Sequence, residues 1–417
     1  MINKNFFKDS SLYIISDAFF GGLPIILLPL FSYYLLPEEF GLYANILVLM
    51  NLFSVFIDFS GSGYYGINFH LKNNDFNRDQ IFMNSISVML INLIILFIIV
   101  SLSLDQISDF LKLSYFDIFI CLFFAIITNI NTLYLTKLRF FENVNLFVRL
   151  RLMQVFFHCL FAVFFVIILD YSWEGRYYGH FLSIFIIFPI VIYHERNNIK
   201  FINFFNSSYK HLFAPYLFGL SLLPHVLASW IKTGLDRVLL TNSENISANG
   251  IYSTAFQLSM VLVLLGVGFN KAFTPLIYKL LSKKDFKNSR ILLLQFFGLN
   301  FIATIVLLII YPFIVKLFLS EEYISVLPIT PYVIIAQGFL NIYIIASSIL
   351  FFLKQTSLLS FISIISAIIH VLFLYILVNE YLEFGAAISF LISAIIQTIL
   401  VVFLVLTKAP GLWKSKI

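Results

Sequence analysis

Long apolar segments separated by short polar stretches run along the whole chain. Each segment holds about twenty predominantly apolar residues, which is the length that crosses the hydrocarbon core of a bilayer as a helix. The runs are continuous, whereas strands of a transmembrane barrel alternate apolar and polar positions. We therefore predict twelve membrane-spanning helices, at residues 11–36, 41–63, 81–104, 114–136, 152–170, 177–193, 212–241, 250–277, 291–315, 329–353, 358–378 and 384–406.

The composition supports the same fold class. The 417 residues are 61% hydrophobic and only 11% charged, with a mean hydropathy of +0.97. A soluble protein of this length could not cover its surface with so few polar residues. The sequence therefore predicts an all-α integral membrane protein with short loops and no separate soluble domain.

Basic residues mark one side of the predicted membrane. Most of the 26 Lys and Arg residues fall in alternate connecting segments, and only Lys112, Arg176 and Lys316 lie on the opposite side. By the positive-inside rule, both termini are predicted to be cytoplasmic. This distribution also explains the net charge of +5 without a nucleic-acid partner, although residues 283–287 could attract anionic membrane lipid.

The chain divides into two halves of six predicted spans each. The polar connection 194–211 lies midway, so we expect an N-terminal bundle at 1–193 and a C-terminal bundle at 212–417. An even number of spans gives both halves the same orientation, as in parallel repeats that enclose a central site at their interface.

A short internal repeat supports these two halves. Phe-Gly-Leu-Tyr at 40–43 begins the second span, and Asn-Gly-Ile-Tyr at 249–252 begins the eighth. Pro24 in the first span has a counterpart in Pro224 of the seventh. The two halves are therefore predicted to be pseudo-symmetric.

Four charged residues lie inside the seventh and eighth spans. Each of Lys232, Asp236, Arg237 and Lys271 costs about 2.5–3.5 kcal/mol to insert, so a functional site is the default interpretation. Lys232 and Asp236 are four residues apart and could instead form a structural ion pair. Both interpretations remain open at this point.

The seventh span has a polar face. At helical spacing five residues fall within about 80° of one another, which predicts a face turned toward protein or water rather than lipid. They are Ser221, His225, Ser229, Lys232 and Asp236.

Two further carboxylates are candidates for ion coupling. Asp17 shares a face of the first span with Gly21 and Pro24, and Asp58 shares a face of the second with Asn51, Ser54 and Ser62. A carboxylate facing a cavity inside the membrane can take up a proton. The alternative is a carboxylate that is hydrogen-bonded at a helix end, and it is favoured more for Asp58 than for Asp17.

The sequence shows no catalytic or metal-binding pattern. His158, His225 and His370 stand alone in different spans, and Cys121 and Cys159 lie in apolar segments without metal-ligand spacing. There is no glycine-rich phosphate loop and no nucleophile motif. We expect neither an enzyme nor a bound cofactor or metal.

Several short motifs occur in a characteristic order. They are Pro24 to Tyr43, with Pro-x-x-x-x-Pro and then Phe-Gly-Leu-Tyr, followed by Leu235-Asp236-Arg237, Gly250-Ile251-Tyr252-Ser253 and Asn270-Lys271-Ala272-Phe273-Thr274-Pro275. With these motifs, and in its length and number of spans, the chain resembles the Wzx-type polysaccharide flippases of the MOP exporter superfamily, which carry O-antigen or capsule repeat units.

The resemblance implies a V-shaped fold of two six-helix bundles around a cationic central cavity that opens alternately to each side. It implies a multi-pass protein of the bacterial cytoplasmic membrane and a substrate of undecaprenyl pyrophosphate carrying a short oligosaccharide. Lys232, Arg237 and Lys271 would then bind the headgroup, with His225 on the same face as Lys232 and with Asp236 holding or releasing Lys232. Asp17 and Asp58 would couple transport to H⁺ or Na⁺.

Two other classes of function remain as alternatives. A MATE-like exporter of amphipathic cations should have an acidic cavity, whereas the charges in these spans are mostly cationic. A polytopic polysaccharide polymerase would need a large outer loop, and the predicted outer loops are short.

Overall fold

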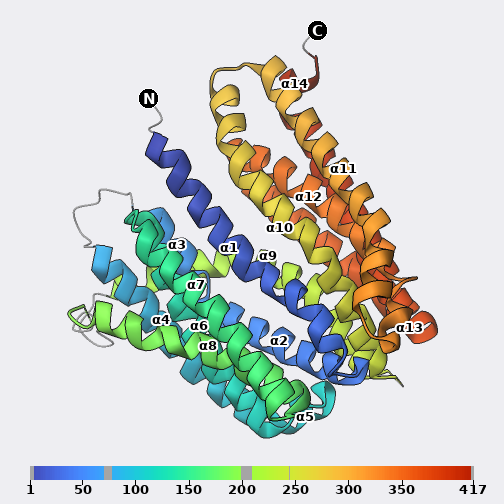
Figure 1. Ribbon diagram of the computed structural model, residues 1–417. Helices are drawn as coiled ribbons and strands as arrows, with labels where there is room; N and C mark the ends of the chain where they lie inside the picture. The colour runs from blue at the N-terminus through green and yellow to red at the C-terminus, as the bar shows by residue number, and fades with distance from the viewer. Residues whose placement is uncertain (1–3, 70–77, 199–208, 244, 415–417) are drawn as a thin grey trace. The chain divides into compact units, whose positions relative to one another are not determined.

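The computed structural model describes residues 4–69, 78–198, 209–243 and 245–414, and this part of the chain is helical throughout (Figure 1). The α-helices, the π-helical turn η1 and the 3₁₀ turn η3 are α1 Lys4–Ser32, α2 Pro37–Asp58, α3 Gly61–Asn68, α4 Arg78–Leu102, α5 Leu104–Leu111, α6 Tyr115–Phe140, α7 Val144–Val163, η1 Phe164–Ile168, α8 Ser172–Glu195, α9 Tyr209–Thr241, α10 Ser247–Ser282, α11 Phe286–Phe318, η3 Glu321–Val326, α12 Thr330–Phe352, α13 Thr356–Lys408 and α14 Gly411–Lys414.

Eleven helices among the described residues are long and apolar enough to cross a membrane. The eleventh, α13, has 53 residues and bends at Leu382, whose backbone is non-helical (φ 46°, ψ −125°). Its two arms contain the predicted spans 358–378 and 384–406. The structure therefore agrees with the predicted all-α membrane fold and is consistent with twelve spans.

The described chain forms two compact units. Unit 1 comprises residues 1–23 and 42–230, and unit 2 comprises residues 24–41 and 231–417. The predicted linker 194–211 lies largely outside the described residues, and the predicted boundary there stays a prediction. The chain passes from one unit to the other within three helices, α1, α2 and α9.

Long-range contacts explain why residues 24–41 belong to unit 2. The side-chain amide of Gln257 donates to the Pro24 carbonyl, and the Tyr323 hydroxyl donates to the Leu35 carbonyl at 2.8 Å. Ring contact between Phe40 and Tyr323, with centroids 6.1 Å apart, adds to this packing. These contacts join residues more than 200 positions apart, so the pattern of the sequence does not predict them.

In unit 1, small residues bring α7 and α8 close together. A Cβ added to Gly179 would lie 2.4 Å from the Ala162 nitrogen, and one added to Gly175 would lie 2.9 Å from the Phe165 carbonyl carbon. Glycines four residues apart allow helix backbones to approach closely within a membrane.

In unit 2, the two copies of the predicted repeat meet. The Asn249 side chain donates to the Gly41 carbonyl at 2.9 Å. A Cβ on Gly250 would lie only 1.6 Å from the Pro37 carbonyl oxygen, so only glycine fits there. The start of α2, at Pro37 and Gly41, thus closely contacts the start of α10, at Asn249 and Gly250.

Candidate functional site

Asp236 lies at the centre of a buried polar cluster in unit 2. Its carboxylate is fully buried and accepts a hydrogen bond from the Tyr252 hydroxyl. Its other oxygen lies 2.5 Å from Nε2 of His370, which is also fully buried and comes from α13. A charge in such a position needs partners, because an unpaired buried charge is strongly unfavourable.

Lys232, one turn earlier on α9, has a different partner. Its ammonium group donates to the side-chain oxygen of Gln397 on α13, and the side chain is almost fully buried. Lys232 and Asp236 thus each have a partner elsewhere, and the structural ion pair between them is not the arrangement seen.

Arg237 is held between α9 and α10. Its Nε donates to the Ser253 hydroxyl at 3.0 Å, and another guanidinium nitrogen donates to the Thr233 carbonyl. The guanidinium carbon lies 4.6 Å from the centre of the Phe256 ring. The charged residues Lys232, Asp236 and Arg237 of α9 therefore all have hydrogen-bond partners within unit 2.

Lys271 lies far from these groups along the helix axis. Side-chain hydrogen bonds join Thr241 to Asn249, Asp236 to Tyr252 and Arg237 to Ser253. These pairs show that α9 and α10 form an antiparallel hairpin. In this register Lys232 is level with residue 257, so Lys271 is about 20 Å further along α10 at 1.5 Å per residue. Lys271 is exposed, and it does not join the buried cluster.

His225 belongs to unit 1, whereas Lys232 belongs to unit 2. It is half-buried, and the adjacent polar positions Ser221 and Ser229 are exposed. The polar face of α9 therefore does not form a single site within one unit. The substrate-binding role of these residues remains a prediction.

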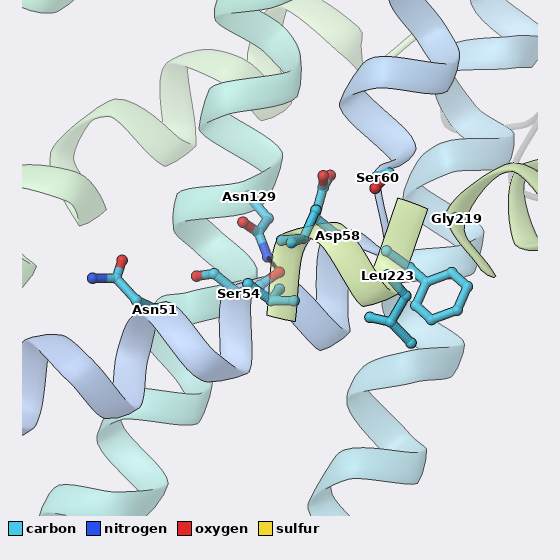
Figure 2. A pocket seen from close by; sticks show the side chains of 10 residues that line it. Asn51, Ser54, Asp58, Ser60, Asn129, Gly219 and Leu223 are labelled. Atoms are coloured by element: carbon cyan, nitrogen blue, oxygen red, sulfur yellow. Dashed lines mark hydrogen bonds between the residues drawn. The ribbon is translucent and has the colours of Figure 1, made fainter. Parts of the chain in front are cut away.

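Unit 1 contains a cavity of about 310 Å³ that Asp58 lines (Figure 2). Asn51, Ser54 and Asp58, three of the four polar residues on the predicted face of α2, line it together with Asn129 of α6. The remaining lining residues are Val55, Phe59, Ser60, Gly219, Leu223 and Val226.

Asp58 is also hydrogen-bonded at the end of α2. One carboxylate oxygen accepts from the Ser62 backbone nitrogen at 3.2 Å and from the Ser62 hydroxyl at 2.9 Å. Phe59 and Ser60 follow with φ of 45° and 61°, so α2 ends directly after the carboxylate and α3 begins at Gly61. Asp58 thus has the predicted helix-end hydrogen bonds and also borders a cavity.

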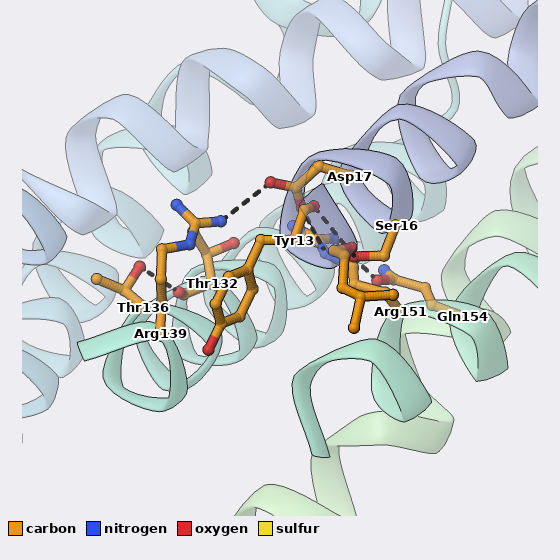
Figure 3. Close-up of polar contacts among 9 residues, drawn as sticks. Tyr13, Ser16, Asp17, Thr132, Thr136, Arg139, Arg151 and Gln154 are labelled. Atoms are coloured by element: carbon orange, nitrogen blue, oxygen red, sulfur yellow. Dashed lines mark hydrogen bonds and ion pairs between the residues drawn. The ribbon is translucent and has the colours of Figure 1, made fainter. Parts of the chain in front are cut away.

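Asp17 lies between two arginines of unit 1 (Figure 3). One carboxylate oxygen is 3.0 Å from a terminal nitrogen of Arg139 on α6, and the other is 3.3 Å from Nε of Arg151 on α7. The sequence identified Asp17 but treated both arginines only as topology signals.

The sequence missed several partners of the charged residues. His370 stood alone in its span, Tyr252 was noted only as part of a motif, and Gln397 carried no signal. A buried carboxylate requires a donor, so a histidine in another span was an available clue for Asp236. Among the described residues, no group of three His, Cys, Asp or Glu side chains could hold a metal ion.

Comparison with known proteins gives a family and a fold. A family model described as "Polysaccharide biosynthesis protein" matches residues 6–281. A search of curated proteins gave no match.

Solved structures with a similar fold are multidrug resistance MATE family transporters of the MOP superfamily. An inward-facing one aligns with a TM-score of 0.76 at 13% identity, covering 95% of this chain and 96% of that chain. An outward-facing one aligns with a TM-score of 0.65 at 15% identity, covering 98% and 97%. The chain therefore has a fold of the MATE type.

Proposed function

Because the chain belongs to the polysaccharide biosynthesis protein family and has a MATE-type transporter fold, we propose that it is a flippase for lipid-linked oligosaccharides. Its substrate would be a repeat unit of O-antigen or capsule on undecaprenyl pyrophosphate, carried from the cytoplasmic to the outer face of the bacterial cytoplasmic membrane. The family match carries this proposal. It connects the chain with polysaccharide biosynthesis, and the fold is that of a membrane transporter, which needs no catalytic module.

The intramembrane cations suit such a substrate. A pyrophosphate crossing the bilayer loses its water, and Lys and Arg side chains can replace that water with charge-assisted hydrogen bonds. We assign this role to Lys232, Arg237 and Lys271. Because Lys232 and Arg237 have partners in unit 2, headgroup binding would exchange those partners for phosphate oxygens.

We further propose that transport is coupled to H⁺ or Na⁺. Asp58 lines a cavity with side-chain oxygens of Asn51, Ser54 and Asn129, and such hard oxygen donors suit a small cation or a proton. Asp17 is the second coupling candidate. Each charge that crosses with the membrane potential gains about 2.3 kcal/mol per 100 mV, which is enough to bias direction.

A MATE-like cation exporter is the second candidate function. The similarity to multidrug transporters favours it, as does the carboxylate at the cavity of unit 1. The two functions predict opposite charges on the transported group, so they separate in a single experiment.

The test is deletion of the gene in its own host, followed by measurement of surface polysaccharide and of the lipid-linked repeat unit. We expect surface polysaccharide to fall and the repeat unit to accumulate on the cytoplasmic face. The wild type should restore both, whereas Lys232→Ala, Arg237→Ala and Lys271→Ala should fail at normal protein level. Lys316→Ala is a matched control, because it removes an exposed cation at the end of α11.

Unchanged surface polysaccharide with reduced tolerance to cationic drugs would overturn the flippase and support the exporter. Repeat units that reach the outer face but stay unpolymerised would point to a polymerase instead.

A further inference from the structure

Two arginines of unit 1 converge on a single carboxylate. Arg139 is in the last turn of α6 and Arg151 is in the second turn of α7, and both contact Asp17 of α1 (Figure 3). Two guanidinium groups and one carboxylate leave one surplus positive charge. Arginine pairs of this kind recognise phosphate, because each planar guanidinium can donate two parallel hydrogen bonds to its oxygens.

Aromatic rings also contact both guanidinium groups. The guanidinium carbon of Arg151 lies 4.6 Å from the Phe20 ring centre, and that of Arg139 lies 5.2 Å from the Phe147 ring centre. Arg151 also donates to the side-chain oxygen of the buried Gln154 at 3.2 Å. The contacts of Arg139 with Phe147 and of Arg151 with Gln154, both on α7, would therefore remain if the carboxylate moved away.

The cluster is accessible rather than sealed. The Arg139 side chain is 43% exposed, while those of Asp17 and Arg151 are 21% and 17% exposed. Both arginines lie near the α6–α7 connection, which the positive-inside rule assigns to the cytoplasmic side. A phosphate group arriving from that side can reach the guanidinium groups.

We propose that Arg139 and Arg151 form an entry site for the diphosphate group of a lipid-linked substrate, and that Asp17 is the internal anion that the diphosphate displaces. This rests on the proposed function and extends it to a site outside α9 and α10. Because Asp17 comes from a different helix, its displacement removes the two ion pairs that join α1 to α6 and α7, and leaves the aromatic contacts of Tyr13 and Phe20 in place. Asp17 then acts as a gate on headgroup entry.

The test measures diphosphate binding to the purified full-length protein in nanodiscs, with inorganic pyrophosphate and geranyl diphosphate as probes. Asp17→Asn should raise the affinity at least about fivefold, because it removes the competing anion. Arg139→Gln with Arg151→Gln should lower the affinity by at least about tenfold. Arg149→Gln is the control, because this exposed arginine of α7 should leave the affinity unchanged.

A purely structural ion pair gives a different pattern. Asp17→Asn would then lower thermal stability without raising the affinity for either probe, and this result overturns the proposal.

A second variant guards against misfolding. Arg139→Lys with Arg151→Lys keeps both charges beside Asp17 but loses the guanidinium fork, so we expect a folded protein with weakened diphosphate binding. Undiminished binding in that variant would count against guanidinium recognition.

A lipid headgroup is the other source of the same phosphate chemistry. Native mass spectrometry of nanodiscs containing phosphatidylglycerol and a polyprenyl diphosphate separates the two. Preferential retention of the diphosphate, lost in the double Gln variant, supports the entry site. Equal loss of phosphatidylglycerol would show that the arginines bind membrane lipid and would overturn the assignment.

Failure of the entry site is distinguishable from failure of the flippase. Normal surface polysaccharide in a host carrying the double Gln variant overturns the entry site and leaves the flippase standing. The opposite pair of results is diphosphate binding that depends on both arginines, together with a host whose surface polysaccharide does not require the protein. This pair supports the entry site and overturns the flippase.

Discussion

At the residue scale, the buried charges of unit 2 are defined by their partners. Asp236 is bonded to Tyr252 and His370, and Lys232 to Gln397, so each charge is satisfied by a side chain from another helix. The sequence could locate these charges, because charged residues stand out in apolar spans. It could not pair them, because helical spacing reports only on neighbours within one helix. Lys232 and Asp236 have that spacing, yet each has a partner elsewhere.

Replacing His370 tests the importance of this pairing. His370→Ala leaves the fully buried Asp236 with one partner fewer, and we expect a loss of about 3–5 kcal/mol in unfolding free energy. Thermal unfolding of the purified protein in detergent measures it. His194→Ala, at an exposed histidine near the end of α8, should stay within about 0.5 kcal/mol of wild type. Equal effects at both positions would argue against a stabilising Asp236–His370 pair.

At the element scale, close helix contacts depend on single glycines. The internal repeat predicted that residues 40–43 and 249–252 are related, and the structure shows that they also touch. Periodicity predicted where the helices lie, because long apolar runs are a strong signal. It could not predict which helix faces meet. It placed a break between the spans 358–378 and 384–406, where the structure has the bend at Leu382, but not the close approach of Gly385 to Leu377 across that bend.

Gly250→Ala should disrupt the contact between α2 and α10. The added methyl group would lie 1.6 Å from the Pro37 carbonyl oxygen, so a backbone must move, at a cost of about 1–3 kcal/mol or more. Thermal unfolding again provides the measurement. Gly268→Ala on the same helix is the control, since no atom lies within 4 Å of its added Cβ and alanine favours helix. A Gly250→Ala protein as stable as that control would contradict the close packing.

The start of α11 carries a pH-dependent cap. Asp285 accepts hydrogen bonds from the Asn288 side chain at 2.7 Å and from the Asn288 backbone at 3.2 Å, and these bonds lower the pKa of Asp285. A lowered pKa in the folded state means that the cap stabilises fully above the carboxylate's ordinary pKa of about 4 and is lost as the pH falls through the folded value.

We therefore expect the melting temperature of the wild type, relative to Asp285→Asn, to fall as the pH is lowered from about 5 to about 3. Asparagine keeps an acceptor at the cap but cannot titrate in this range, so the difference between the two proteins isolates the carboxylate. A difference that is constant with pH would show that its charge does not contribute.

At the scale of the whole molecule, composition and charge asymmetry sufficed to predict a helical membrane protein with short loops. The membership of the two compact units was not predictable in the same way. Residues 24–41 join unit 2 through contacts such as Gln257 to the Pro24 carbonyl, and α9 passes from one unit to the other at residue 230. Such contacts depend on tertiary packing between distant segments, which no local pattern records.

The most direct test of the flippase is transport in reconstituted proteoliposomes. A fluorescent oligosaccharide on polyprenyl diphosphate is placed in both leaflets, and its exposure to a membrane-impermeant quencher is followed over time. We predict that the wild type makes the protected inner pool accessible, and that a combined Lys232→Ala, Arg237→Ala and Lys271→Ala variant is at least about tenfold slower at equal reconstitution. A wild-type rate equal to that of protein-free vesicles, under an imposed H⁺ or Na⁺ gradient, would contradict the central claim.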